Sequence, residues 1–114
     1  MEIDDLKKFG IDGTNKGKLI IDISSEWCEP CKILSPLLEK FRDKGLINLI
    51  QIDLYQQSDL VNSLGITSVP TLLFFKDGKL LEKEIKIDGY TMVKNGVMIG
   101  ATGELILKEI IKKM

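Results

Sequence analysis

The chain carries the sequence Trp27-Cys28-Glu29-Pro30-Cys31-Lys32, which holds the only two cysteines among its 114 residues. This stretch follows an apolar run at residues 19–23 and leads into a helical pattern of apolar residues at 32–42. A helix N-terminus offers unpaired backbone N–H groups and a partial positive charge, and both favour a thiolate. Because the thiolate is the nucleophile of disulfide exchange, the placement predicts a redox-active pair.

Two other uses of a close cysteine pair remain open on these grounds. A zinc or iron–sulfur site takes four ligands, and a chain with no histidine and no further cysteine supplies them only across a dimer. A permanent structural disulfide between Cys28 and Cys31 would close a very short loop, so its entropic gain would be small. We therefore expect no metal, and no cofactor beyond the Cys28–Cys31 disulfide itself.

Composition narrows the class of protein. A chain of 114 residues is expected to form one domain, 1–114. Its net charge of −1 provides no basic surface, so nucleic acid and anionic membranes are not expected partners. The start, Met1-Glu2-Ile3-Asp4-Asp5, is acidic and unlike a signal peptide, and no run approaches the ~18 apolar residues of a spanning helix. We expect a cytoplasmic monomer.

The spacing of apolar residues predicts alternating helices and strands. Helices are expected near residues 3–9, 32–42 and 58–64, with a last one capped by Thr102, and strands at 18–24, 48–54, 71–75 and 79–87. The first two strands, joined through a helix, should be parallel. Asp77-Gly78 predicts an antiparallel hairpin, and Asp88-Gly89 and Asn95-Gly96 are further turn signals. The last helix is expected to bury Leu105, Ile106, Ile110 and Ile111.

The chain resembles the thioredoxin family well beyond the cysteine pair. Trp27 precedes the pair, Pro30 lies inside it, Lys32 and Pro36 follow it, and Asp22 lies in the preceding strand. Residues 65–78, Gly-Ile-Thr-Ser-Val-Pro-Thr-Leu-Leu-Phe-Phe-Lys-Asp-Gly, look like the family's cis-proline strand and hairpin, and Gly100-Ala101 also matches. The resemblance implies an α/β thioredoxin fold, with a mixed central sheet of four or more strands flanked by helices.

The resemblance also implies roles for single residues. Cys28 would attack, Cys31 would resolve the mixed disulfide, and Asp22 would relay a proton for Cys31. A cis bond before Pro70 would leave the Val69 backbone free to pair with a substrate. The implied docking surface comprises Trp27, Glu29, Pro30, Ser68, Val69, Pro70, Ile99 and Gly100.

The residues themselves leave other roles open. Asp22 could be a half-exposed strand residue, Trp27 a core residue, and Pro70 an ordinary trans proline at the start of a strand.

Four departures from the family pattern stand out. Glu29 takes the place of a usual glycine, and its negative charge should disfavour the Cys28 thiolate and make the couple more reducing. Leu49 replaces a lysine that often lies near the buried aspartate, which should leave the pKa of Asp22 higher. Residues 1–17 are expected to form only a short helix and loop. Residues 83–98 are an insertion, which narrows the choice of substrates or merely pads the edge of the sheet.

The interpretation that combines these observations is a thiol–disulfide oxidoreductase that reduces protein disulfides. The resemblance implies a thioredoxin-reductase-like flavoenzyme as its electron donor. One alternative is an extracytoplasmic thiol reductase of the cytochrome-c-maturation type, which the Glu-Pro dipeptide resembles. Another is a redox-inert binding module with the same fold.

Overall fold

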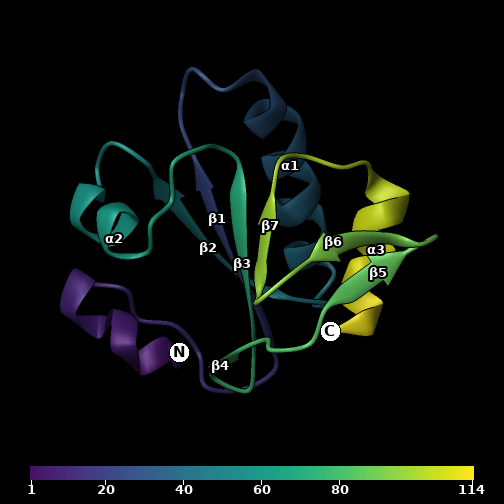
Figure 1. The fold of residues 1–114 in the computed structure, drawn as a ribbon, viewed down its shortest axis with the longest axis horizontal. Coiled ribbons are helices and arrows are strands. Elements are labelled where there is room, and N and C mark those ends of the chain that lie inside the picture. Colours follow the sequence, from purple (N-terminus) through teal and green to yellow (C-terminus); the bar gives the residue numbers. More distant parts are fainter.

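Strand β1 (Lys18–Ser24) lies at the centre of the computed structural model, which describes residues 1–114 (Figure 1). It pairs in parallel with β2 (Asn48–Asp53) and antiparallel with β3 (Thr71–Lys76). Residues 19–23 of β1 are all buried. A strand covered on both faces needs a nearly continuous apolar run. The central position of β1 therefore explains the apolar run from which this strand was predicted.

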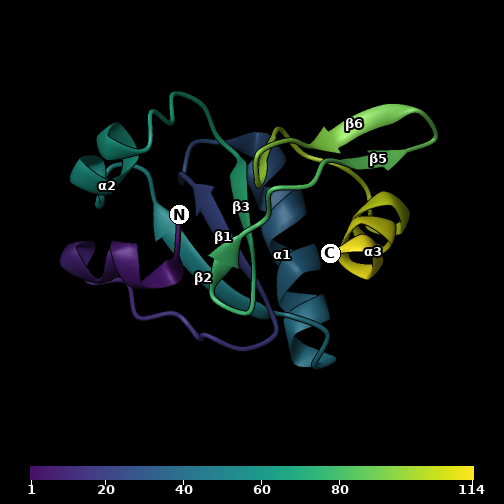
Figure 2. The same cartoon turned by 60° about the horizontal axis from the view of Figure 1, so that its bottom comes forward.

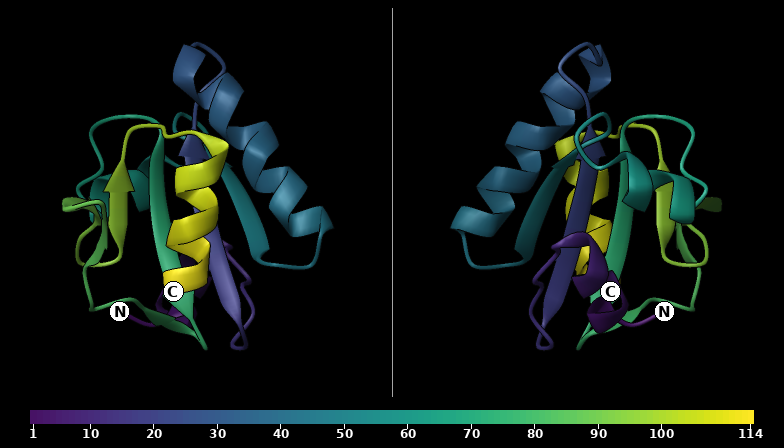
Figure 3. Two further views of the ribbon diagram at one scale, coloured as in Figure 1. Left: turned by 90° about the vertical axis from the view of Figure 1, so that its right-hand side faces the viewer. Right: turned by 90° about the vertical axis from the view of Figure 1, so that its left-hand side faces the viewer.

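Helices cover both faces of the sheet (Figure 3). Helices α1 (Glu29–Asp43) and α3 (Glu104–Lys113) lie on one face. The 3-10 helix η1 (Ile3–Phe9) and α2 (Ser58–Ser63) lie on the other. None of the helices combines the length and the apolar character that crossing a membrane requires.

Alternate residues of β1 and β3 divide the core into two clusters. Ile20, Leu72 and Phe74 pack on the side of α1 and α3. Leu19, Ile21 and Phe75 pack on the side of η1 and α2. This alternation is the period-two geometry of a strand, and it places Asp22, two residues after Ile20, on the α1 face.

The outer edge of β3 is occupied by two short strands placed end to end. Strand β4 (Lys79–Leu80) pairs with one end of β3, and β7 (Val97–Ile99) pairs with the other. Between them, Phe74 accepts a hydrogen bond from the Leu81 N–H and donates its own N–H to the Gly96 carbonyl. The chain therefore leaves the sheet after Leu81 and returns at Gly96, and both of these residues are hydrogen-bonded to Phe74 of β3.

The residues between these two points form a separate hairpin. Strands β5 (Ile85–Ile87) and β6 (Tyr90–Val93) make a two-stranded sheet that lies over α3 (Figure 2). The prediction of one returning strand at 79–87 was wrong, because only Lys79 and Leu80 of that range pair with β3. Ile85 and Ile87 do alternate as in a strand, but the face they bury lies against the core cluster of α3.

The three predicted turns are confirmed by the backbone. Asp77, Asp88 and Asn95 each have a positive φ of 50–53°, and each is followed by a glycine that also has a positive φ. Two consecutive positive φ values define the tight turn that best matches the twist of a hairpin. These turns connect β3 to β4, β5 to β6 and β6 to β7.

Two helix boundaries differ from the prediction. Helix α1 begins at Glu29 rather than at Lys32, because Pro30 in the first turn lacks only an N–H that the helix does not use. The N-cap of α3 is Gly103 rather than Thr102. The buried face of α3 comprises Leu107, Ile110 and Ile111, and Leu105 is 79% exposed, which reverses the expectation for Leu105.

Candidate active site

Cys28 and Cys31 lie at the N-terminus of α1 and form a disulfide, with their Cα atoms 5.3 Å apart. Cys28 is the N-cap, and the Cys31 N–H donates a hydrogen bond of 3.2 Å to the Cys28 Sγ. Cys28 is 8% exposed and Cys31 only 3%. The more exposed of the two residues is thus also the one whose sulfur accepts a hydrogen bond from an N–H of the helix end, where negative charge is stabilised.

Asp22 is fully buried beneath α1, so it is not the half-exposed residue that the sequence left open. Its Oδ2 accepts a hydrogen bond of 2.7 Å from the Ser35 hydroxyl, and its Oδ1 has no partner. Burial is the main cause that raises the pKa of Asp22 above its usual range, and the negative Glu39 adds to it. The hydrogen bond from Ser35 lowers the pKa and offsets part of this effect, and the nearby Gln51 side chain acts in the same direction.

The surface beside Cys28 carries an aromatic ring and an ion pair. Trp27 is 82% exposed, which rules out the alternative of a core residue. The Glu29 carboxylate lies 3.0 Å from the Lys32 ammonium group, one turn along α1. Because both side chains are exposed, this pair only partly neutralises the charge that Glu29 brings to the first turn.

Two of the other predicted segments meet at the end of β3. The Val69–Pro70 peptide bond is cis, and the Pro70 carbonyl accepts a hydrogen bond of 2.8 Å from the Gly100 N–H. Ile99, the preceding residue, is 71% exposed and pairs with Thr71 in the sheet. Ser68 is also exposed, and its carbonyl accepts a hydrogen bond from the Thr71 hydroxyl. The structure therefore joins the proline segment to the Ile99–Gly100 segment.

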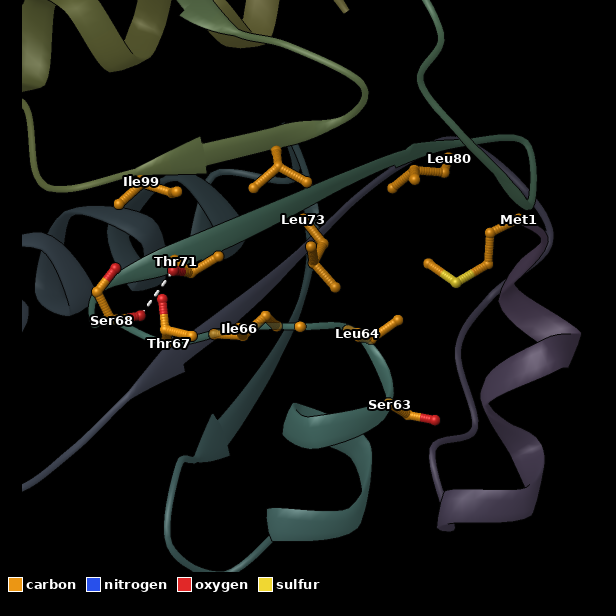
Figure 4. A pocket seen from close by; sticks show the side chains of 12 residues that line it. Met1, Ser63, Leu64, Ile66, Thr67, Ser68, Thr71, Leu73, Leu80 and Ile99 are labelled. Atoms are coloured by element: carbon orange, nitrogen blue, oxygen red, sulfur yellow. Dashed lines mark hydrogen bonds between the residues drawn. The ribbon is translucent and has the colours of Figure 1, made fainter.

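A pocket of about 360 Å³ opens between these segments and the loop that follows α2 (Figure 4). Ser68 and Ile99 line one end, and Met1, Leu64 and Leu80 lie toward the other. The lining is mainly apolar, so the pocket extends the exposed surface of Ile99 with a recess that suits an apolar side chain.

Ser35 is the site residue that the sequence did not single out. It follows Cys31 by four residues on α1, which places both on one side of the helix. The available signal was this spacing, together with a polar residue between the buried Leu34 and Leu38. No group of three or more His, Cys, Asp or Glu residues is arranged to hold a metal ion.

The sequence matches the family model named Thioredoxin over residues 6–96. The thioredoxin of Mycoplasmoides gallisepticum is 40% identical over 73 residues, which cover 63% of this chain and 72% of that protein. The thioredoxin of Chlamydia muridarum is 33% identical over 85 residues, which cover 73% and 83% of the two chains.

Solved structures show the same similarity. A mutant thioredoxin from Halobacterium salinarum aligns with a TM-score of 0.69 at 25% identity, covering 88% of this chain and 76% of that one. Oxidised mitochondrial thioredoxin 3 from Saccharomyces cerevisiae aligns with a TM-score of 0.63 at 27% identity, covering 87% and 80%.

Proposed function

Because the chain belongs to the thioredoxin family and is a thiol–disulfide oxidoreductase, we propose that it reduces disulfides of other proteins. The observation that carries this proposal is the position of Cys28, which caps α1 while it shares a disulfide with Cys31. Neither an extracytoplasmic cytochrome-c-maturation reductase nor a redox-inert module is favoured, since the relatives are thioredoxins and the two cysteines lie at disulfide distance.

Cys28 is the attacking residue in this cycle. Once the pair is reduced, the Cys31 N–H and the helix end stabilise a thiolate at Cys28, and the greater exposure of Cys28 gives a substrate access to it. Its sulfur attacks one sulfur of the substrate disulfide and forms a mixed disulfide, while the other substrate sulfur leaves with the electron pair.

Cys31 then completes the exchange with the help of Asp22. Asp22 takes the Cys31 proton, because burial raises the pKa of this carboxylate and so makes it a stronger base than an exposed one. The Cys31 sulfur attacks Cys28, the bond to the substrate breaks, and the reduced substrate leaves.

The substrate segment would lie over the surface formed by Trp27, Glu29, Pro30, Ser68, Val69, Pro70, Ile99 and Gly100. The exposed Trp27 and Ile99 supply apolar contact area, and the Pro70–Gly100 hydrogen bond fixes one side of the surface. This geometry supports the docking of an extended chain.

The remaining components follow from the family. We propose a thioredoxin-reductase-like flavoenzyme as electron donor, a cytoplasmic location and a monomeric state. A sedimentation velocity run should give a single species near the chain mass of 12.8 kDa. A sedimentation coefficient that corresponds to a dimer would contradict the proposed monomeric state.

Reduction of insulin by dithiothreitol tests the activity. The unaltered protein should accelerate insulin precipitation, and Cys28→Ser should abolish the acceleration. Cys31→Ser should retain substrates as mixed disulfides on Cys28, visible by non-reducing electrophoresis and mass spectrometry. Capture by Cys28→Ser instead would reverse the proposed roles, and an inactive unaltered protein would contradict the function.

We also propose that the insertion at 83–98 narrows the choice of substrates. Its last two residues already belong to β7, whose Ile99 is exposed, and it carries Tyr90, which is 74% exposed on the hairpin. Tyr90→Ser changes the surface without removing a core residue. Equal rates of this variant and the unaltered protein with several different protein disulfides would contradict the proposal.

A further inference from the structure

Ser35 links the buried Asp22 to the outside of the molecule. Its hydroxyl donates to the Asp22 Oδ2 at 2.7 Å, and Ser35 itself is only partly buried. It also lines an open groove of about 300 Å³, together with Cys31 and Glu39 on α1 and with Ser24 at the end of β1 and the two residues that follow it. The same side chain therefore contacts the carboxylate on one side and reaches an open groove on the other.

Asp22 has few other polar contacts in its surroundings. Its Oδ1 is buried without a partner, and its neighbours in the sheet are Gln51 on β2 and Leu72 on β3. Burying a carboxylate with so few hydrogen bonds disfavours its charged form. The Ser35 hydroxyl is the contact that opposes this effect most strongly, followed by Gln51.

Ser35 connects Asp22 to the helix that carries Cys31. Cys31 and Ser35 lie one turn apart on the same side of α1, and Ser35 is bonded to Asp22. A proton that passes from Cys31 to Asp22 is therefore separated from the groove only by the Ser35 hydroxyl.

We propose that Ser35 is a positioning residue that keeps Asp22 able to accept the Cys31 proton and then passes that proton to the groove. This inference rests on the proposed function, because it assigns the proton path of the second exchange step. Cys31 gives its proton to Asp22, its sulfur bonds to Cys28, and the substrate sulfur leaves as a thiolate with the electron pair. Asp22 then donates the proton to the Ser35 oxygen while the hydroxyl hydrogen of Ser35 passes to water.

The charges around this path come from several elements. Glu39 on α1 raises the pKa of Asp22, and Glu26 and Lys32 also line the groove. On the sheet side, Gln51 contributes an amide and Leu72 an apolar side chain. Ser35 is the hydroxyl donor to Asp22 among these groups, so its removal changes the carboxylate directly.

The test compares Ser35→Ala with Ser35→Thr, which keeps a hydroxyl, and with Ser25→Ala, which removes a hydroxyl from the same groove. A helix tolerates alanine well, so the first variant should fold. NMR titration of the Asp22 carboxyl carbon in the oxidised protein gives the pKa without any turnover. Stopped-flow reaction of the reduced protein with Ellman's reagent then separates the Cys28 step, the first thionitrobenzoate released, from the Cys31 step, the second.

Ser35→Ala should raise the pKa of Asp22 and slow the Cys31 step about tenfold at neutral pH, since a hydrogen bond to a charged group is lost. Its pH profile should shift upward while the Cys28 step stays unchanged. Ser35→Thr should restore both quantities, and Ser25→Ala should resemble the unaltered protein. In an Asp22→Asn background, Ser35→Ala should have no further effect on the Cys31 step.

An unchanged pKa and pH profile in Ser35→Ala would overturn the inference. The inference would also fail if Ser35→Ala slowed the Cys31 step as much in the Asp22→Asn background as it does in the unaltered protein. If the unaltered protein released no second thionitrobenzoate, the proposed function would fail, and the NMR titration would still decide whether Ser35 controls Asp22.

Discussion

At the scale of single residues, Asp22 makes the stability of the folded protein depend on pH. Burial raises its pKa in the folded state above the value of about 4 expected in an unfolded chain. Between these two values the folded state binds more protons than the unfolded state, so the free energy of unfolding falls as the pH rises. The stabilising effect of the protonated form is fully present below pH ~4 and is lost as the pH rises through the folded-state pKa.

Asp22→Asn should therefore make the oxidised protein more stable at pH 7 and remove the decline above pH ~4 that Asp22 causes. The amide keeps the size of the carboxyl group and cannot ionise. Urea unfolding at a series of pH values measures this, with the exposed Asp12→Asn as the matched control. A parallel decline in the Asp22→Asn variant and the unaltered protein would show that another group causes it.

Glu29 adds a negative charge and Lys32 a positive charge to the first turn of α1, so they have opposite effects on the Cys28 thiolate. Glu29→Gln removes the negative charge beside Cys28 and should stabilise the thiolate, so the reduction potential should rise, by up to about 30 mV. Lys32→Gln should shift the potential the opposite way. Equilibration with glutathione redox buffers measures both variants, and shifts of the same sign would contradict this electrostatic account.

The sequence could predict the cysteine pair and Asp22 as site residues but not Ser35. A CxxC pair at the start of a helix and a carboxylate in an apolar strand are unusual locally, so they stand out without a structure. Ser35 is an ordinary small residue in a helix, and its role exists only because Asp22 lies opposite it, 13 positions away. A contact between two elements is not visible in the pattern of either one.

At the scale of elements, the hairpin of β5 and β6 serves as a cover for α3. Ile85, Ile87 and Val93 are buried in the same cluster as Leu107 and Ile110. The Lys113 ammonium group also donates to the Lys86 carbonyl across this contact. The hairpin therefore contributes to the core, in addition to any effect on substrates.

Ile85→Ala should lower the free energy of unfolding by about 2–4 kcal/mol, because Ile85 is 2% exposed and its loss leaves a cavity. Lys86→Ala, on the exposed face of the same strand, should change it by less than about 0.5 kcal/mol. Urea denaturation compares the two variants. Equal effects would mean that the hairpin does not pack on α3 as described.

The alternation of Ile85 and Ile87 could predict a strand, but not the sheet to which it belongs. A period of two shows only that one face is buried, and either the edge of β3 or α3 could have covered it. The three Asx–Gly turns were predictable because a positive φ at two successive positions is a local property of the chain.

At the scale of the whole molecule, stability should be unevenly distributed. Strand β1 has a hydrogen-bonded neighbour on each side and helices over both faces, whereas β5 and β6 pair only with each other. A two-stranded sheet is marginal by itself, so it should open locally while the central strands stay closed.

Native-state hydrogen exchange should therefore give the highest protection at the amides of residues 19–23, with free energies near that of global unfolding. The amides of residues 85–93 should exchange through smaller openings that depend little on denaturant. Equal protection of both regions would show that the hairpin and the central sheet unfold as one unit.

The segment between Leu81 and Gly96 starts and ends at the same place on the edge of β3, so this edge can accept segments of different length. Because Phe74 bonds both Leu81 and Gly96, the two ends of the excursion are adjacent, and their separation does not depend on how many residues lie between them. The cysteine pair is carried by α1, which enters from β1 on the opposite side of β3. Segments of different length can thus be exchanged at this point, by evolution or by a designer, while the reacting sulfurs keep their place.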